Sequence, residues 1–284
     1  MINSLLPYYG AKRSISPDII AELGPHRSYW EPFCGSMAVL LAKPRCQQET
    51  VCDLNGDLIN LARVLADAVS GPALYRKLRR LPASEEIFNL ACEPVPDDVG
   101  DMGRAAAYFI ESWLGRNGLT GSRYKGNSFC VRYTNNGGST ATRWNSAVRS
   151  ILEFRRRLRD VTILCRSAFE VLPNIADEDG TAIYADPPYL QKSKSYIHDF
   201  FTTDHGVLAK ELCRFKRARV VVSYYDDPLL GDYYPGWTVR KLTRHKNMSN
   251  SGGGNGEKAA PEVLLLNGPS YAGGQQHFLS DEVI

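Results

Sequence analysis

The chain has 284 residues, of which 43% are hydrophobic and 23% are charged, and its formal net charge is +3. These values are typical of a soluble globular protein and allow one large α/β domain with a smaller insert. The net charge is too small to identify a binding partner. No apolar stretch approaches the length of a membrane span, and the N-terminal apolar stretch is too short for a signal peptide, which excludes a membrane protein.

The seven cysteines contain no C-x-x-C pair, and several lie in apolar runs where a free thiol packs as a small hydrophobic group. This pattern predicts a reducing compartment and no structural zinc. We therefore expect a cytoplasmic protein that uses no metal.

Short apolar runs alternate with helical patterns along most of the chain, which predicts a parallel sheet with crossover helices. Helices are expected at 37–43, 57–70 and 204–217. The strands are expected at 28–33, 50–54, 161–165, 181–185, 218–225, 237–244 and 262–267. The last two strands are expected to form a closing pair joined by a long Gly-rich loop. The fold class is therefore α/β.

The segment 71–154 interrupts this alternation and is predicted to be an insert between the second and third strands. It combines helical pieces, such as 104–115, with the stretch 115–144, which is rich in Gly, Asn, Thr and Arg. Such a composition is typical of a loop-rich surface that presents hydrogen-bond donors. The predicted domains are therefore 1–70 with 155–284, and the insert 71–154.

Positive charge is concentrated around the end of this insert. From Trp113 to Asp160 there are ten arginines and lysines against Glu153 and Asp160, a balance of about +8. The pattern favours binding to a polyanion. For the run Arg155–Arg159 alone, the solvated face of a helix is an equally good interpretation.

Four marked stretches follow predicted strands, at the edge where open α/β sheets bind ligands. They supply a turn glycine, Gly35, an acid, Asp53, an aromatic ring, Phe169, and the sequence Asp-Pro-Pro-Tyr at 186–189. Taken singly, a plain turn, a helix cap and a core phenylalanine explain the first three. Together they describe a cleft for a nucleoside cofactor. Neither G-x-G-x-x-G nor a P-loop occurs, which favours a cofactor without phosphates, such as S-adenosylmethionine.

The chain resembles the Dam-type DNA adenine-N6 methyltransferases (D12 class, alpha group) over nearly its whole length. The motifs that carry the resemblance are YYGAKRSI (8–15), EPFCGSMAV (31–39), DLNGDLIN (53–60), RNGLTGSRY (116–124), IYADPPY (183–189), HDFFTTDHGVLAKEL (198–212) and VVVSYYD (220–226). The resemblance implies a Rossmann-like, seven-stranded methyltransferase sheet with an inserted DNA target-recognition domain that is mostly helical and loop-rich. It also implies S-adenosyl-L-methionine as the cofactor and a protein encoded by a prokaryote or a phage.

The family motifs imply roles for individual residues. The expected cofactor contacts are Tyr9, Lys12, Phe33, Gly35, Asp53, Phe169 and Asp186. Two positions depart from the family pattern. Met37 stands where the form F-x-G-x-G carries its second glycine, and Ala168 stands where an acid often precedes the aromatic residue. The second departure removes a side chain that could bind the amine of the cofactor's adenine.

The catalytic residues are predicted to be Asp186, Pro187, Pro188 and Tyr189. An exocyclic amine is a poor nucleophile because its lone pair is delocalised into the ring. The Asp186 carboxylate and the Pro187 carbonyl can each accept one N–H bond and draw the nitrogen towards tetrahedral geometry. Tyr189 is expected to stack on a base flipped out of duplex DNA. This chemistry needs neither a metal nor a covalent nucleophile.

The insert is expected to bind DNA. The candidate contacts to phosphates and base edges are Arg116, Asn117, Arg123, Lys125, Asn135, Asn136 and Arg143, with Trp144 beside the last group. The expected function is site-specific methylation of adenine N6 in duplex DNA, by a monomer or a dimer. Methylation of cytosine N4 is the alternative within the same chemistry, and an RNA substrate or an inactive DNA-binding protein are less favoured alternatives.

Overall fold

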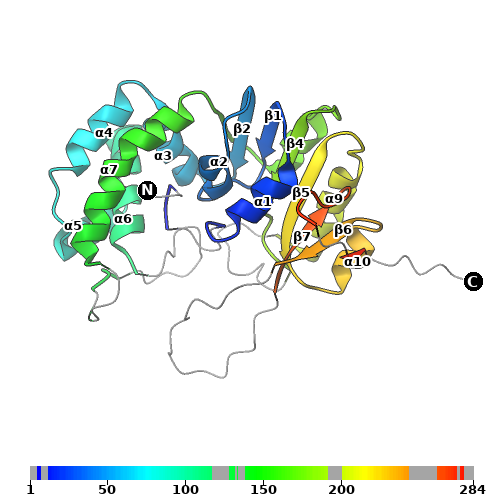
Figure 1. Ribbon diagram of the computed structural model, residues 1–284. Helices are drawn as coiled ribbons and strands as arrows, with labels where there is room; N and C mark the ends of the chain where they lie inside the picture. Colours follow the sequence, from blue (N-terminus) through cyan, green and yellow to red (C-terminus); the bar gives the residue numbers. More distant parts are fainter. Residues whose placement is uncertain are drawn as a thin grey trace, which may run out of the picture.

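A computed structural model describes residues 5–7, 12–116, 128–131, 133, 138–190, 200–242, 261–273 and 276–277. Its centre is a single sheet with the strand order β3-β2-β1-β4-β5-β7-β6-β8 (Figure 1). The strands are β1 (Ser28–Glu31), β2 (Gln48–Asp53), β3 (Thr162–Cys165), β4 (Thr181–Ala185), β5 (Arg219–Tyr225), β6 (Thr238–Lys241), β7 (Glu262–Leu266) and β8 (Gln276–His277).

The sheet is mixed. Strands β1 to β5 pair in parallel, whereas β7 runs antiparallel to both β5 and β6. All seven strands expected from the sequence are present, and the Rossmann-like α/β prediction is confirmed. The two-residue strand β8, paired with the edge strand β6, is an addition that the sequence pattern did not indicate.

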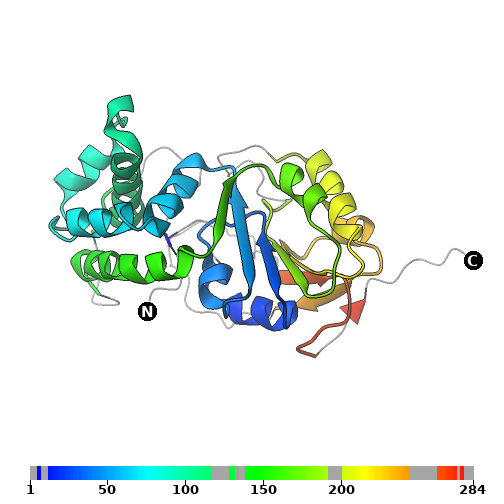
Figure 2. The same ribbon diagram turned by 90° about the horizontal axis from the view of Figure 1, so that it is seen from above.

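Helices lie on both faces of the sheet and beyond its β3 edge (Figure 2). The helices are α1 (Ser16–Leu23), α2 (Ala38–Ala42), α3 (Gly56–Ala66), α4 (Ser70–Leu78), α5 (Glu85–Cys92), α6 (Gly100–Leu114), α7 (Thr140–Leu158), α8 (Ala168–Val171), α9 (Thr202–Cys213) and α10 (Leu229–Tyr233), with short 3-10 turns at Asp97–Val99 and Leu172–Asn174. None of the helices in the described ranges is both long and apolar enough to cross a bilayer.

Each face of the sheet builds its own core, because successive strand side chains point to opposite faces. In β4, whose five residues are all buried, Ala182 and Tyr184 belong to one cluster, and Ile183 and Ala185 belong to the other. A strand covered on both faces reads as a continuous apolar run, which is why the sequence pattern located β4 correctly.

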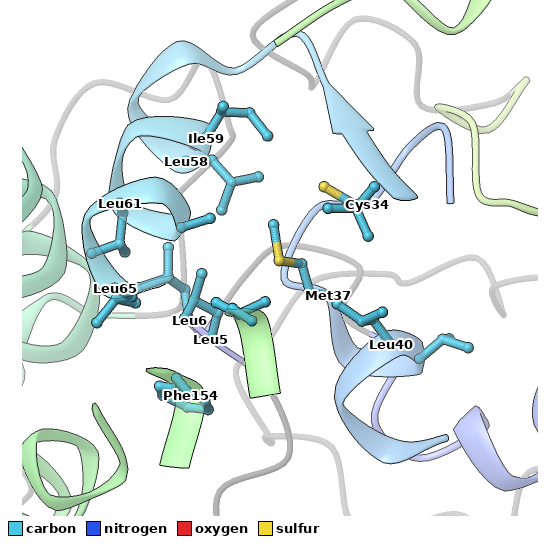
Figure 3. Close-up of a cluster of buried hydrophobic side chains, with 14 of the residues drawn as sticks. Leu5, Leu6, Cys34, Met37, Leu40, Leu58, Ile59, Leu61, Leu65 and Phe154 are labelled. Carbon is cyan, nitrogen blue, oxygen red and sulfur yellow. The ribbon is translucent and has the colours of Figure 1, made fainter. Parts of the chain in front are cut away.

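The first of these cores extends from the sheet into the helices α3 to α7. Figure 3 shows part of this core, with Met37 lying among Leu6, Cys34 and Leu58. The same buried cluster continues to Phe109 of α6 and to further side chains of α7. The helical region is therefore packed onto the sheet through α3 as part of one continuous core.

The structure corrects the sequence prediction at 140–144. These residues form the first turns of α7, where the sequence indicated a loop. Ser139 caps the helix through its side chain, which accepts the N–H of Thr142. Trp144, considered as a DNA contact, is instead 1% exposed, and its indole N–H donates to the carbonyl of Leu81. Its size and buried hydrogen bond mark it as a core residue.

The order of the strands determines where a ligand can bind. The chain winds outward from β1 to β3 and then returns to place β4 on the other side of β1. Open α/β sheets usually bind ligands at such a reversal, beyond the carboxyl ends of the strands on either side of it, which here are β1 and β4.

Candidate active site

Asp186 lies immediately after β4, at the carboxyl edge of the sheet beside the point of reversal. Two prolines follow it and end the strand, because neither can donate a ladder hydrogen bond. The Ser223 hydroxyl donates to Asp186 Oδ1 at 2.7 Å, and Lys12 Nζ lies 2.9 Å from Oδ2. Both carboxylate oxygens therefore have a fixed partner, while each retains a second lone pair for another donor.

The surroundings of Asp186 raise its pKa above the ordinary value. Burial makes the largest contribution, and the nearby Glu262 carboxylate adds to it. The Lys12 ammonium and the Ser223 hydroxyl act in the opposite direction, because both stabilise the ionised form. Asp186 is thus a carboxylate with increased proton affinity that is still paired with a cation.

Tyr189 is almost fully enclosed, with 4% of its surface exposed. The Tyr189 hydroxyl donates to Glu262 Oε1 at 2.9 Å. The rings of Tyr189 and Tyr225 meet edge to face, with 4.5 Å between their centroids. Lys12 Nζ lies over the ring, 4.9 Å from its centroid. Burial raises the pKa of the Tyr189 phenol well above its ordinary value, so the hydroxyl remains a donor.

Lys12 connects the two acids of the site. Its Nζ is 2.9 Å from Asp186 and 3.5 Å from Glu262 Oε1, and the residue is 6% exposed. The resemblance assigned Lys12 to the cofactor without foreseeing these ion pairs. They bring the N-terminal segment, the end of β4 and the start of β7 to one point.

Two residues of this cluster were not foreseen from the sequence. Glu262 begins β7, and Ser223 lies in the middle of β5, fully buried. The Tyr184 hydroxyl lies 2.9 Å from Ser223 Oγ, and because Ser223 donates to Asp186, Tyr184 must be the donor in this pair. A buried serine or glutamate in an otherwise apolar strand is the signal that could have identified both residues.

A third acid, Glu31, is buried at the end of β1 and is 2% exposed. Burial, and to a smaller extent the charge of Asp186, raise the pKa of Glu31 to about 8. The Tyr29 hydroxyl donates to Glu31 Oε2 at 2.9 Å and opposes this rise. Near neutral pH, Glu31 is therefore mainly a neutral carboxylic acid.

Asp53 lies at the end of β2, on the same edge of the sheet. Its Oδ2 accepts the N–H of Gly35 at 2.9 Å, and its Oδ1 accepts the N–H of Asn55 at 2.9 Å. Gly35 has φ of 43°, in the left-handed region that glycine adopts most readily. The structure thus brings together the predicted turn glycine and the predicted acid, and the turn orients the carboxylate.

Three phenylalanines form an aromatic cluster beside these residues. Phe169, in the first turn of α8, stacks on Phe200 with an interplanar angle of 16°, and Phe33 meets Phe200 edge to face. Phe33 and Phe169 are both half-buried. Phe200 is a member of this cluster to which the sequence assigned no role.

Both departures from the family motif can be located. Met37, in place of the glycine, has φ of 55° and keeps a left-handed conformation, with its side chain fully buried. Ala168 is buried at the start of α8, where a capping box between Ser167 and Glu170 satisfies the first N–H groups. The methyl group of Ala168 can accept no hydrogen bond, as the sequence implied.

Of the predicted DNA contacts, Arg116 and Arg143 lie within the described part of the chain. Arg116 is exposed at the end of α6, and its backbone N–H donates to the Ser128 carbonyl. Arg143 is half-buried, with its guanidinium 5.4 Å from the centroid of the Trp113 ring. The candidates outside the described residues are Tyr9, Asn117, Arg123, Lys125, Asn135 and Asn136.

Metal-binding side chains do not cluster in the ranges that the structure describes. There, no group of three or more His, Cys, Asp or Glu side chains could hold a metal ion.

Comparisons with known proteins show which family the chain is similar to. A family model described as D12 class N6 adenine-specific DNA methyltransferase matches residues 8–248. The Retron Ec67 DNA adenine methylase of Escherichia coli is 26% identical over 286 residues, which cover 94% of this chain and 92% of the relative. A solved rRNA methyltransferase, aviRa from Streptomyces viridochromogenes, is 15% identical with a TM-score of 0.43, covering 94% of this chain and 91% of its own.

The family match confirms the resemblance seen in the sequence and spans all of the strands up to β6. It supports adenine as the target over the cytosine-N4 alternative, and an enzyme over an inactive DNA-binding protein. The chain belongs to the D12 class of N6 adenine-specific DNA methyltransferases, enzymes that methylate adenine in DNA.

Proposed function

We propose that this enzyme transfers a methyl group from S-adenosylmethionine to N6 of an adenine that is flipped out of duplex DNA. In this proposal Asp186 and the Pro187 carbonyl bind the target amine, and Tyr189 stacks on the base. The observation that carries the proposal is the position of Asp186 at the point of strand reversal, held by Lys12 and Ser223.

The residues at the carboxyl edge fit S-adenosylmethionine in their chemistry. The carboxylate of Asp53 is held by the N–H groups of Gly35 and Asn55 at the carboxyl edge, and a carboxylate can accept hydrogen bonds from the two hydroxyls of a ribose. Phe33 and Phe169 offer half-buried rings for the adenine, and Lys12 offers a cation for a carboxylate. When bound, the cofactor supplies a methyl group on a positively charged sulfur.

The protein's contribution to the reaction is the alignment of the amine. Asp186 accepts one N6–H bond and the Pro187 carbonyl accepts the other, so the nitrogen lone pair turns away from the ring. Lys12, Phe33, Asp53 and Phe169 would hold the cofactor, whose methyl group would exchange its bond to sulfur for a bond to N6, with the electron pair of the broken bond left on sulfur. One proton leaves N6 and passes to Asp186, whose raised pKa suits it to accept that proton.

Stacking on Tyr189 requires a rearrangement of its present neighbours. Because the ring is almost fully enclosed, a base can lie against it only by displacing a group that now contacts it, such as Tyr225 or Lys12. The Glu262 hydrogen bond can keep the hydroxyl end fixed during this exchange. Enclosure before DNA binds would also protect an apolar ring from water.

We assign target recognition to the helical region α4–α7 and the segment between α6 and α7. Arg116 lies just after the end of α6 and Arg143 lies in the first turns of α7, so the two residues flank that segment. Asn117, Arg123, Lys125, Asn135 and Asn136 lie within it. Arginines suit phosphates and guanine edges, and asparagines suit adenine edges. The predicted division into 1–70 with 155–284 and 71–154 remains part of this proposal.

The decisive experiment is labelled-methyl transfer onto mixed duplex DNA, followed by mass spectrometry of the nucleosides. We expect N6-methyladenine from the wild type, and a loss of about 10²- to 10³-fold or more in D186A because that variant removes a preorganised acceptor. Cofactor affinity, measured by calorimetry, should stay close to that of the wild type.

The matched control is E49Q, which neutralises a buried acid at the opposite end of the sheet. It should retain activity. Substantial turnover in D186A would refute the role of Asp186. N4-methylcytosine as the sole product would refute the proposed target atom.

A further inference from the structure

We propose that Glu262 is a positioning residue of the methyl-transfer site, which fixes the ring of Tyr189 through its hydroxyl and shares Lys12 with Asp186. The inference rests on the proposed function, because it concerns the same catalytic residues. No motif of the sequence indicated Glu262, and its role follows from its contacts.

Glu262 occupies a place where a carboxylate is costly. It begins β7 opposite Tyr225 of β5, and all five residues of β7 are buried. The residue is 3% exposed, although burying a charged group is strongly unfavourable unless partners compensate for the lost water. Two such partners are the Tyr189 hydroxyl at 2.9 Å and the Lys12 ammonium at 3.5 Å.

The first effect of these contacts is on geometry. Tyr189 follows two prolines, which fix their own φ angles but leave the tyrosine side chain free to rotate. Glu262 belongs to β7, and it holds the hydroxyl end of the Tyr189 side chain. A ring anchored at both ends presents a defined face, and positioning to within about 1 Å can change a rate by about 10²-fold.

The second effect is on charge. Lys12 lies nearer to Asp186 than to Glu262, and its ammonium stabilises both carboxylates. The negative charge of Glu262 in turn contributes to the raised pKa of Asp186, after the larger effect of burial. Glu262 therefore keeps Asp186 receptive to a proton while Lys12 keeps it ionised.

The test separates these effects with two substitutions. E262Q retains an oxygen that can accept the Tyr189 hydroxyl, but it removes the charge. E262A removes both. We expect kcat of E262Q at its optimum to be within about threefold of the wild type, and kcat of E262A to fall by about 10- to 100-fold.

The pH profile gives a readout that a purely structural role would not change. Loss of the Glu262 charge should lower the pKa of Asp186, so the acidic limb of kcat/KM should move to lower pH in E262Q. The matched control E49Q neutralises a buried acid that also has a lysine partner, and it should leave both kcat and the acidic limb unchanged.

A double-mutant cycle with Y189F tests whether Glu262 acts through the tyrosine hydroxyl. Y189F keeps the ring and removes the donor, so E262A should cost less in the Y189F background than in the wild type. Binding of a duplex with 2-aminopurine at the target position reports stacking independently of turnover. Its fluorescence should change in E262A and should be restored towards the wild-type value in E262Q.

Two results would overturn the inference: E262A with wild-type kcat, or E262Q and E262A with equal losses and an unmoved acidic limb. Additive effects of E262A and Y189F on kcat would show that Glu262 does not act through the Tyr189 hydroxyl. All of these outcomes require an active wild type. A wild type that transfers no methyl group to DNA adenine would instead refute the proposed function. Thermal unfolding of each variant identifies any loss that comes from misfolding.

Discussion

The two ends of the central sheet each bury an ionic cluster, and the clusters differ in their balance of charge. At the amino end of β2, Glu49 has two cationic partners, with Lys43 Nζ at 2.6 Å and both terminal nitrogens of Arg157 in contact. At the carboxyl ends, Asp186 and Glu262 share Lys12. Both clusters are buried, so desolvation alone cannot explain how they differ.

The consequence is seen in the two acids. Burial raises the pKa of Asp186. Burial acts in the same direction on Glu49, but hydrogen bonds from Arg157 and Lys43 outweigh it and lower the pKa of Glu49. At the amino end, the two cations therefore compensate for the burial of Glu49, and the contact with Arg157 holds α7 against the sheet. The carboxyl end retains an electrostatic cost, as is common where titratable groups serve catalysis.

The largest difference between the two clusters should appear when one lysine is removed from each. K12M leaves Asp186 and Glu262 without their shared cation, and breaking a buried pair costs about 3 kcal/mol or more of stability. It should also reduce kcat by about 10²-fold and move the acidic limb to higher pH, because Asp186 loses the ammonium that lowers its pKa. Methyl-transfer kinetics against pH, with denaturant unfolding, measure both effects.

K43M is the counterpart. The lysine is equally buried and paired, but Glu49 keeps Arg157. We expect K43M to lose stability while kcat and the acidic limb stay unchanged. Equal catalytic losses in K12M and K43M would show that the two ends of the sheet do not differ in function.

Glu31 offers a second test through the dependence of stability on pH. Its folded pKa of about 8 lies above the ordinary 4.5, so the folded state binds more protons than the unfolded state between these values. Stability must then fall as pH rises through that window, by up to about 1.4 kcal/mol per pH unit for this group. E31Q mimics the protonated acid, so the stability of the wild type relative to E31Q should decline from pH 5 to 8.

Glu49 should show the opposite sign. Its folded pKa is lowered, so its contribution is present above the ordinary pKa and is lost as pH falls through the folded value. The wild type should therefore lose its advantage over E49Q towards acidic pH. Urea unfolding at a series of pH values measures both differences, and slopes of the same sign would contradict the proposed contrast.

The sequence predicted the central strands of the sheet well because β4, β5 and β7 are buried on both faces. The runs at 182–185 and 263–266 are continuous and apolar, so the positions of these strands can be predicted without tertiary information. Helix α7 was partly missed because Gly, Thr and Asn before residue 140 indicate loops, whereas the core around Trp144 stabilises helix in the residues that follow. Here tertiary packing overrides local composition.

The site divides in the same way. Asp186, Tyr189, Asp53 and Gly35 stand in motifs whose spacing carries their chemistry, so they could be named from the sequence. Glu262 could not be named from the sequence, because its partner Tyr189 lies 73 residues away and its partner Lys12 lies still further away. A contact between distant segments leaves no local pattern. Only the polarity of a residue at the start of an apolar strand hinted at a role.

Met37 gives the finest test of the idea that the carboxyl end of the sheet retains energetic costs. Its backbone is left-handed, at φ 55° and ψ 31°, and its side chain fills the core beside Leu58 (Figure 3). A left-handed conformation costs a residue with a Cβ about 1–2 kcal/mol. M37A removes the packing but keeps this strain, whereas M37G removes both. We therefore expect M37G to be more stable than M37A by about 0.5–1 kcal/mol, although glycine leaves the larger cavity and a more flexible unfolded chain.

Leu61, buried in the middle of the right-handed helix α3, provides the matched control for Met37. There, glycine should be less stable than alanine by about 1 kcal/mol. Denaturant unfolding of the four variants measures both differences. If alanine were favoured at both positions, Met37 would carry no strain, and the family glycine would be replaced at no energetic cost.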